Sequence, residues 1–187
     1  FEIAKLWRGS DTWEAQAEVI VDIITSGSAG MVFHSMDERD VQNIMRYPHT
    51  MMASDSGIRK LGQGKPHPRG YGNNARVLGL YTRDLKVLTL EDAVRKMTSL
   101  PARTMRFMDR GILRPGMAAD VVVFDLARVR DAATFEQPHA YAEGFEHVLV
   151  NGTPTILNGE LTTERGGEVI YGTGKKSPAT VITLSSN

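Results

Sequence analysis

The chain has 187 residues, enough for one or two ordinary domains, and a hydrophobic share of 41% that allows a substantial core. Its 22 Lys and Arg residues balance 22 Asp and Glu residues, which argues against a nucleic-acid partner and against an anionic membrane surface. The absence of cysteine excludes disulfides, thiolate nucleophiles and Cys-ligated zinc from this sequence, and no apolar run is long enough to span a membrane.

The start of the sequence gives two indications about its context. No signal peptide is visible, so we expect a cytoplasmic location. The chain also begins at Phe1 without an initiator Met, and the segment 1–6 reads as the middle of a longer sequence. We therefore interpret the chain as a piece of a longer polypeptide.

The first part of the chain alternates predicted helices and strands. A helix is predicted over about 11–26 with Asp11 as N-cap, followed by a short buried strand over 31–33. A second amphipathic helix over 37–46 leads to another strand over 51–54. This order favours a parallel sheet with crossover helices. The apolar side chains that share one face of the first helix are Trp13, Ala17, Ile20, Val21 and Ile24.

A long loop and further helices follow. Glycines and prolines crowd the segment 56–74, and unstructured loops of this length inside a domain are usually functional. A helix is predicted over 74–83. Another begins at Thr89, where Thr89 to Asp92 resembles a capping box, and a further helix is expected after Ser99 as a new cap.

From about residue 110 the pattern becomes β. The segment 120–125 is a predicted strand, and the apolar runs 147–150 and 155–157 each lead into an Asn-Gly pair. Asn-Gly between apolar runs is a strong hairpin signal, because both residues tolerate positive φ. The polar tail from Thr173 is expected to be loose.

Asp55 is the first candidate functional residue, because it follows the apolar run Met51 to Ser54. A carboxylate at the end of a buried strand is costly to desolvate unless it has a partner or a task, and general-base work is one such task. The other interpretation is a turn or N-cap residue, since Ser-Asp-Ser-Gly clusters are common in turns.

Further candidates lie in the loop that follows. Arg69 could grip a carboxylate through two hydrogen bonds, or it could be an ordinary exposed loop arginine. His67 and His34 could be ligands or hydrogen-bonding groups, although lone histidines are more often structural. The segment 62–65 is a weak phosphate-loop look-alike. The remaining histidines, His49, His139 and His147, carry no signal in the sequence.

Taken together, these segments resemble the N-acyl-D-amino-acid deacylases (D-aminoacylases) of the amidohydrolase superfamily. The resemblance covers nearly everything from Met31 to about Val169, and its most specific part is the Ser-Asp-Ser-Gly motif combined with His-Pro-Arg-Gly-Tyr-Gly. The segments that carry it are 53–57, 67–72, 76–79, 90–103, 109–125 and 150–152.

The resemblance implies an α/β fold with two parts. Residues 1–110 would be the last part of a metal-dependent (β/α)8 barrel, and residues 111–172 would be the C-terminal portion of a small β-sandwich or barrel domain, with 173–187 as the loose tail. Such a barrel fragment would leave strand edges and an apolar face exposed, so we expect self-association.

The resemblance also implies roles for individual residues. Asp55 matches the catalytic acid after the last barrel strand, which accepts a proton from metal-bound water and passes it to the leaving amine. Arg69 matches the arginine expected to bind the substrate α-carboxylate, and His67 and Tyr71 belong to the same substrate-binding motif. The partner would be a small-molecule N-acyl-D-amino acid.

The family's metal-ligand motifs are not found in this sequence. No His-x-His occurs, and Asp55 alone cannot supply the three or so protein ligands that catalytic zinc needs. We therefore expect zinc in the intact enzyme, with its ligands upstream of Phe1, and none bound by this fragment. Two alternatives stay open: a dihydroorotase- or hydantoinase-type enzyme acting on a cyclic amide, and a truncated, catalytically inactive module.

Overall fold

The computed structural model describes residues 1–27, 30, 35–58 and 60–172. The chain divides into two compact units, residues 1–35 and residues 36–187, and each is described by itself. The predicted strand over 31–33, the candidate His34 and the predicted loose tail lie outside the described residues. Within the described residues, no helix is long and apolar enough to cross a membrane.

The first unit pairs helix α1 (Glu2–Arg8) with helix α2 (Trp13–Thr25). The N-cap of α2 is Thr12 and not the predicted Asp11, because the Thr12 side chain accepts a hydrogen bond from the Ala15 amide. An ion pair between Arg8 and Asp22 joins the two helices.

The predicted apolar face of α2 is not its buried face. Its buried residues are Ala15 and Val19, which pack with Ala4 of α1, whereas Trp13 is 82% exposed. The short α1 can cover only one strip of α2, and the small side chains of that strip permit the close approach of the helices. The other predicted face residues, Ala17, Ile20, Val21 and Ile24, are also exposed.

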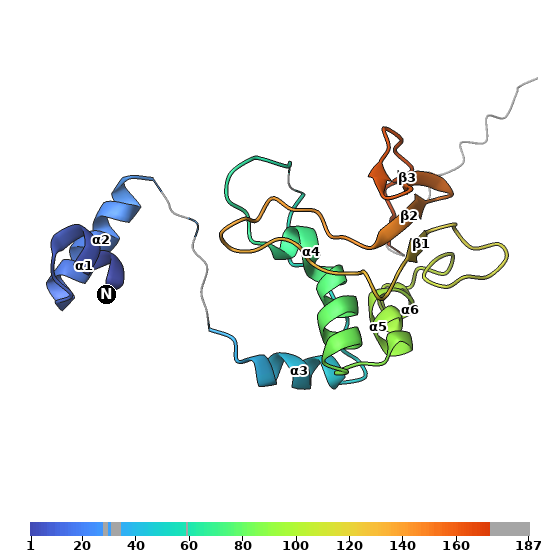
Figure 1. Cartoon of the computed structure of the whole chain (residues 1–187), viewed down its shortest axis with the longest axis horizontal. Helices are drawn as coiled ribbons and strands as arrows, with labels where there is room; N and C mark the ends of the chain where they lie inside the picture. Colours follow the sequence, from blue (N-terminus) through green and yellow to red (C-terminus); the bar gives the residue numbers. More distant parts are fainter. Residues whose placement is uncertain (28–29, 31–34, 59, 173–187) are drawn as a thin grey trace, which may run out of the picture. The chain divides into compact units, whose positions relative to one another are not determined.

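The second unit contains the remaining helices and the sheet (Figure 1). Its helical elements are α3 (Glu38–Arg46), α4 (Arg69–Arg76), the π-helix η1 (Val77–Asp84), α5 (Leu90–Met97) and α6 (Ser99–Thr104). Thr89 caps α5 as predicted by accepting a hydrogen bond from the Asp92 amide at 3.2 Å. Before α6 the cap residue is Thr98, not Ser99.

The predicted long loop is shorter than expected, since α4 begins at Arg69 and continues into η1. Pro68 lies directly before Arg69 with φ −58°, which is already helical, so the proline favours the start of a helix here. Glycine is favoured at position 72 inside α4 because there is no room for a side chain. A Cβ at this position would lie 2.6 Å from Asp131 Cβ.

The prediction of a strand over 51–54 was wrong for the structure described. A strand requires a neighbouring strand for its hydrogen bonds, and none of the described strands pairs with this segment. The Met52 amide instead donates to the Lys96 carbonyl at the end of α5.

The sheet is antiparallel throughout, with strand order β1-β2-β3-β4, as the predicted hairpins require. It lies in residues 121–161, and none of the described residues in the first half of the chain forms a strand that could belong to the expected parallel sheet. Its strands are β1 (Val121–Phe124), β2 (Phe145–Val150), β3 (Thr153–Leu157) and β4 (Glu160–Leu161). Both Asn-Gly hairpins are confirmed: Asn151 and Gly152 have φ of 49° and 79°, and Asn158 and Gly159 have φ of 53° and 80°.

A single apolar core joins the helices of the second unit to the sheet. Phe124 of β1 and Phe145 of β2 pack against it, so the sheet and the helices share one interior. The buried residues of this core are Met45, Ala75, Val77, Leu78, Tyr81, Val87, Leu88, Ala93 and Val129.

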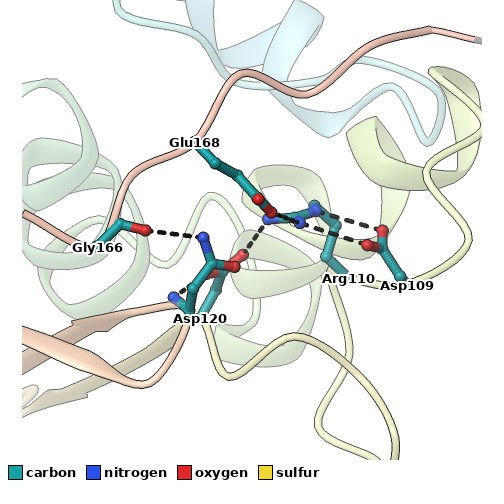
Figure 2. Close-up of polar contacts among 6 residues, drawn as sticks. Asp109, Arg110, Asp120, Gly166 and Glu168 are labelled. Atoms are coloured by element: carbon teal, nitrogen blue, oxygen red, sulfur yellow. Dashed lines mark hydrogen bonds and ion pairs between the residues drawn. The ribbon is translucent and has the colours of Figure 1, made fainter.

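A polar cluster around Arg110 fixes the segment after α6 to the sheet (Figure 2). The Arg110 side chain is only 11% exposed, and its guanidinium contacts Asp109, Asp120 at 2.9 Å and Glu168 at 3.2 Å. Asp120 in turn accepts from the amide of Asn151, in the β2–β3 turn, at 2.9 Å. The cluster therefore ties together three stretches of chain that are distant in sequence.

Candidate functional site

Asp55 and Arg69 lie together in the structure. Arg69 Nη2 is 2.8 Å from Asp55 Oδ2, and 42% of the arginine side chain and 85% of the aspartate side chain are exposed. The two residues flank the segment 56–68, of which the structure describes 56–58 and 60–68, and the ion pair brings the two ends of this loop together. An acid and a guanidinium are thus side by side and accessible to a small molecule.

The backbone at Asp55 turns sharply, with φ of 48° in the left-handed region. Aspartate and asparagine tolerate this region better than other residues with a side chain. The turn interpretation of the Ser-Asp-Ser-Gly motif therefore describes the backbone, while the carboxylate itself faces Arg69 and is largely exposed.

The segment that leads to Asp55 is held by α5. The fully buried side chain of Lys96 donates to the carbonyls of Tyr47 and Thr50, the latter at 3.3 Å, and burial lowers the pKa of its ammonium. Arg95 Nη2 donates to the Pro48 carbonyl at 2.7 Å. These contacts fix residues 47–50 to the helix and so place the chain just before the acid.

Arg69 is placed by the first turn of α4. Its backbone amide donates to His67 Nδ1 at 3.1 Å, so the His67 imidazole satisfies one of the free amides at the helix start. The His67 ring also packs edge-on against Phe135, with 4.9 Å between ring centroids. In this structure His67 shapes the entry into the helix that carries the arginine.

Tyr71, the other candidate from the sequence, joins a residue that the sequence did not indicate. Its hydroxyl is 3.1 Å from His139 Nδ1, and its ring packs against Tyr141 at 5.8 Å between centroids. His139 follows a proline in an irregular segment, without a repeat or ligand spacing. Only its tertiary contacts place it next to Tyr71.

The described residues do not by themselves fit a catalytic metal centre. Among residues 1–27, 30, 35–58 and 60–172, no group of three or more His, Cys, Asp or Glu side chains is arranged to hold a metal ion. Catalytic zinc is held by about three protein ligands.

Comparison with known protein families places the chain as a whole. A model described as amidohydrolase family matches residues 17–156, a range that includes both Asp55 and Arg69. The chain belongs to the amidohydrolase family. The α/β fold class expected from the resemblance agrees with this assignment.

The relatives confirm the resemblance to the deacylases. The chain is 48% identical over 124 residues to an N-acyl-D-glutamate deacylase of Alcaligenes xylosoxydans xylosoxydans, covering 66% of this chain and 25% of that protein. It matches a solved D-aminoacylase structure with a TM-score of 0.72 and 42% identity, covering 81% of this chain and 32% of that one.

A further solved structure is that of N-acyl-D-glutamate deacylase from Bordetella bronchiseptica complexed with zinc and a phosphonate mimic of the tetrahedral intermediate. It matches with a TM-score of 0.59 and 45% identity over 64% of this chain and 25% of that chain. Dihydroorotases also match, more weakly, at 27% identity for one from Lactobacillus acidophilus. This chain spans about a quarter to a third of the length of its deacylase relatives.

Proposed function

We propose that this chain contributes the proton-transfer group and the carboxylate-binding arginine of a zinc-dependent N-acyl-D-amino-acid deacylase. The observation that carries the proposal is the 2.8 Å contact between Asp55 and Arg69. In an N-acyl-amino acid the amide nitrogen and the carboxylate are attached to the same carbon. A group that protonates the nitrogen and a group that binds the carboxylate must therefore be neighbours, as these two are.

The proposed reaction uses Asp55 as a general base and then as a general acid. Its carboxylate accepts a proton from the water that attacks the acyl carbon, and it returns a proton to the amide nitrogen as the C–N bond breaks. The products are a carboxylate and a free D-amino acid. No proton is gained or lost by Asp55 over the full cycle.

Arg69 would orient the substrate for this transfer. A guanidinium has five N–H donors in a planar fork, and the contact with Asp55 uses Nη2. Other donors of the fork can bind a carboxylate in the two-bonded arrangement that arginine favours. The substrate nitrogen is then held next to the acid that protonates it.

Zinc would polarise the acyl carbonyl and activate the attacking water when bound. The described residues offer no ligand cluster for it. We therefore propose that the ligands lie in parts of the protein other than those described, in a (β/α)8 barrel of which residues 1–110 are the last part. Residues 111–172 would then belong to the small β domain of the same enzyme.

The proposal is tested by Asp55→Asn in the protein expressed from the complete reading frame and loaded with zinc. Asparagine keeps the shape of the side chain and tolerates the left-handed backbone at this position, so the variant removes the ionisable group with little strain. We expect kcat on N-acyl-D-amino acids to fall by roughly 10²–10⁴-fold with unchanged zinc content.

The matched control is Asp40→Asn, which neutralises an exposed acid on α3 and should leave kcat unchanged. The substrate panel includes cyclic amides, because dihydroorotases are among the weaker relatives. Full turnover in Asp55→Asn would refute the proposed role of the acid. If the protein hydrolysed only cyclic amides, the proposed N-acyl-D-amino acid substrates would be wrong.

A further inference from the structure

We infer that His139 is a positioning residue that holds the loop between Asp55 and Arg69 and the helix that carries Arg69. The inference rests on the proposed function, since it concerns the arginine proposed to bind the substrate carboxylate. The hydrogen bonds of His139 go to residues other than Asp55 and Arg69. It acts instead on the chain that connects them.

The segment that carries His139 connects β1 to β2 and runs beside α4 (Figure 1). The first part of this segment packs closely against α4 and η1 at two glycines, Gly72 and Gly79. A Cβ at Gly72 would lie 2.6 Å from Asp131 Cβ, and a Cβ at Gly79 would lie 2.6 Å from the Val129 carbonyl oxygen. The start of the segment that leads to His139 is therefore held close to these helices.

An ion pair strengthens the same contact. Arg76 Nη1, in the last turn of α4, lies 2.8 Å from Asp131 Oδ2. Further along, Arg83 Nη1 donates to the carbonyls of Leu126, at 3.0 Å, and Val129, at 2.6 Å. The backbone from residue 126 to residue 131 is thus bound to α4 and η1 by side-chain contacts and by close packing.

The imidazole of His139 bonds to two separate parts of the chain. Nδ1 lies 3.2 Å from the Gly62 amide and 3.1 Å from the Tyr71 hydroxyl, and Nε2 lies 2.8 Å from the Gly64 carbonyl. A backbone amide can only donate and a carbonyl can only accept. The ring must therefore carry its proton on Nε2 and accept at Nδ1, and the Tyr71 hydroxyl donates.

The residues bonded to His139 lie on both sides of Arg69 in the chain. Gly62 and Gly64 are in the middle of the loop whose ends are Asp55 and Arg69, and both have left-handed φ of 81° and 63°. Tyr71 is two residues beyond Arg69 on α4. One ring thus ties the middle of the loop to the helix turn that presents the arginine. Without that tie, the loop has more freedom and the arginine is held less well for the substrate.

The test compares His139→Phe with His139→Asn in the complete zinc-loaded protein. Phenylalanine removes all three hydrogen bonds, whereas the asparagine oxygen can take the place of Nδ1 and accept from Gly62 and Tyr71. We expect His139→Phe to raise KM for N-acyl-D-amino acids by roughly tenfold or more, with kcat changed much less, on the scale of lost hydrogen bonds. His139→Asn should recover part of the loss, and Tyr71→Phe should show a smaller rise.

A substrate analogue distinguishes a loss of Arg69 positioning from a general disruption of the protein. When the α-carboxylate is replaced by a carboxamide, Arg69 has no anion to bind, so His139→Phe and the parent protein should have similar KM. His147→Phe, which removes an imidazole bonded to the β3–β4 turn, is the control and should behave as the parent on both substrates. An equal rise of KM on both substrates in His139→Phe would overturn the inference.

A second readout needs no catalysis. The ¹⁵N shifts of the neutral His139 ring should show the Nε2–H form, and the Gly62 amide should exchange more slowly than in His139→Phe. A ring protonated on Nδ1 instead would contradict the inference. Inactive Asp55→Asn together with an unchanged KM in His139→Phe overturns the role of His139 alone, whereas active Asp55→Asn overturns the proposed function on which it rests.

Discussion

The Arg69 guanidinium contacts the Asp55 carboxylate at 2.8 Å, yet most of the Asp55 side chain remains exposed. Ion pairs this exposed to water contribute little to folding, typically about 0–1 kcal/mol. The pair is therefore not a main source of stability. Because breaking this exposed ion pair costs little free energy, both side chains could turn toward a bound substrate in the proposed function.

Replacing Arg69 by lysine should weaken substrate binding while keeping the charge. Lysine offers a single ammonium and cannot form the two parallel bonds of a guanidinium fork. We expect KM for N-acyl-D-amino acids to rise by roughly 10-fold, corresponding to about 1.4 kcal/mol of lost binding, with a smaller change in kcat. Steady-state kinetics check this. Arg46→Lys on α3 is the control, and an unaltered KM in Arg69→Lys would contradict the proposed role.

Replacing Lys96 by methionine should destabilise the second unit. Methionine keeps most of the apolar stem but leaves the carbonyls of Tyr47 and Thr50 without the ammonium that now binds them. An unsatisfied buried polar group costs about 1–3 kcal/mol. Urea unfolding of the chain measures the loss. Lys60→Met, at an exposed loop position, should be nearly neutral, and equal stabilities of the two variants would refute this account of the buried lysine.

Replacing Gly79 by alanine should also destabilise the chain, although alanine is the better helix former. The added Cβ would lie 2.6 Å from the Val129 carbonyl oxygen, so η1 and the segment beside it would have to separate. Such overpacking costs about 1–3 kcal/mol, more than the gain of up to about 1 kcal/mol in helix propensity.

The control for this glycine is Gly57→Ala. A Cβ at Gly57 would meet nothing within 4 Å, and its backbone is not left-handed. Thermal unfolding should show a lower Tm for Gly79→Ala and an unchanged or slightly higher Tm for Gly57→Ala. A Gly79→Ala variant as stable as the parent would show that the close approach is not needed.

The carboxyl of Asp37, the N-cap of α3, should titrate below its ordinary pKa of 3.8, because the Arg39 side chain and amide donate hydrogen bonds to it. The lowered pKa means that the ionised form is favoured in the folded state. Its contribution to stability is therefore present above pH 3.8 and is lost as the pH falls through the folded-state pKa. Carbon-detected NMR titration measures this directly.

The side chain of Arg39 is the main cause of this shift, so Arg39→Gln should bring the pKa of Asp37 back toward 3.8. Arg46→Gln, at the other end of α3, should leave it where it was. A pKa for Asp37 that does not respond to Arg39→Gln would assign the shift to the backbone amides of the helix start instead.

Features that depend on a few neighbouring residues could be predicted before the fold was known. The Asn-Gly hairpins and the Thr89 cap were predicted because their backbone conformations and hydrogen bonds close within a few residues. The family motif also picked out Asp55 and Arg69, because each lies in a short run of residues typical of the deacylases. The roles of these two residues, and the barrel and domain boundaries, stay predictions.

The buried surfaces and the contacts between distant groups became known only from the fold. The buried residues of α2 are Ala15 and Val19 and not the larger apolar ones of its predicted face, and the run at 51–54 is not a strand, because burial and strand pairing need a partner from elsewhere in the chain. The contact of His139 with Gly62 spans 77 positions in sequence, and no local pattern encodes it. A hydrogen bond between such distant groups exists only once the fold has brought them together.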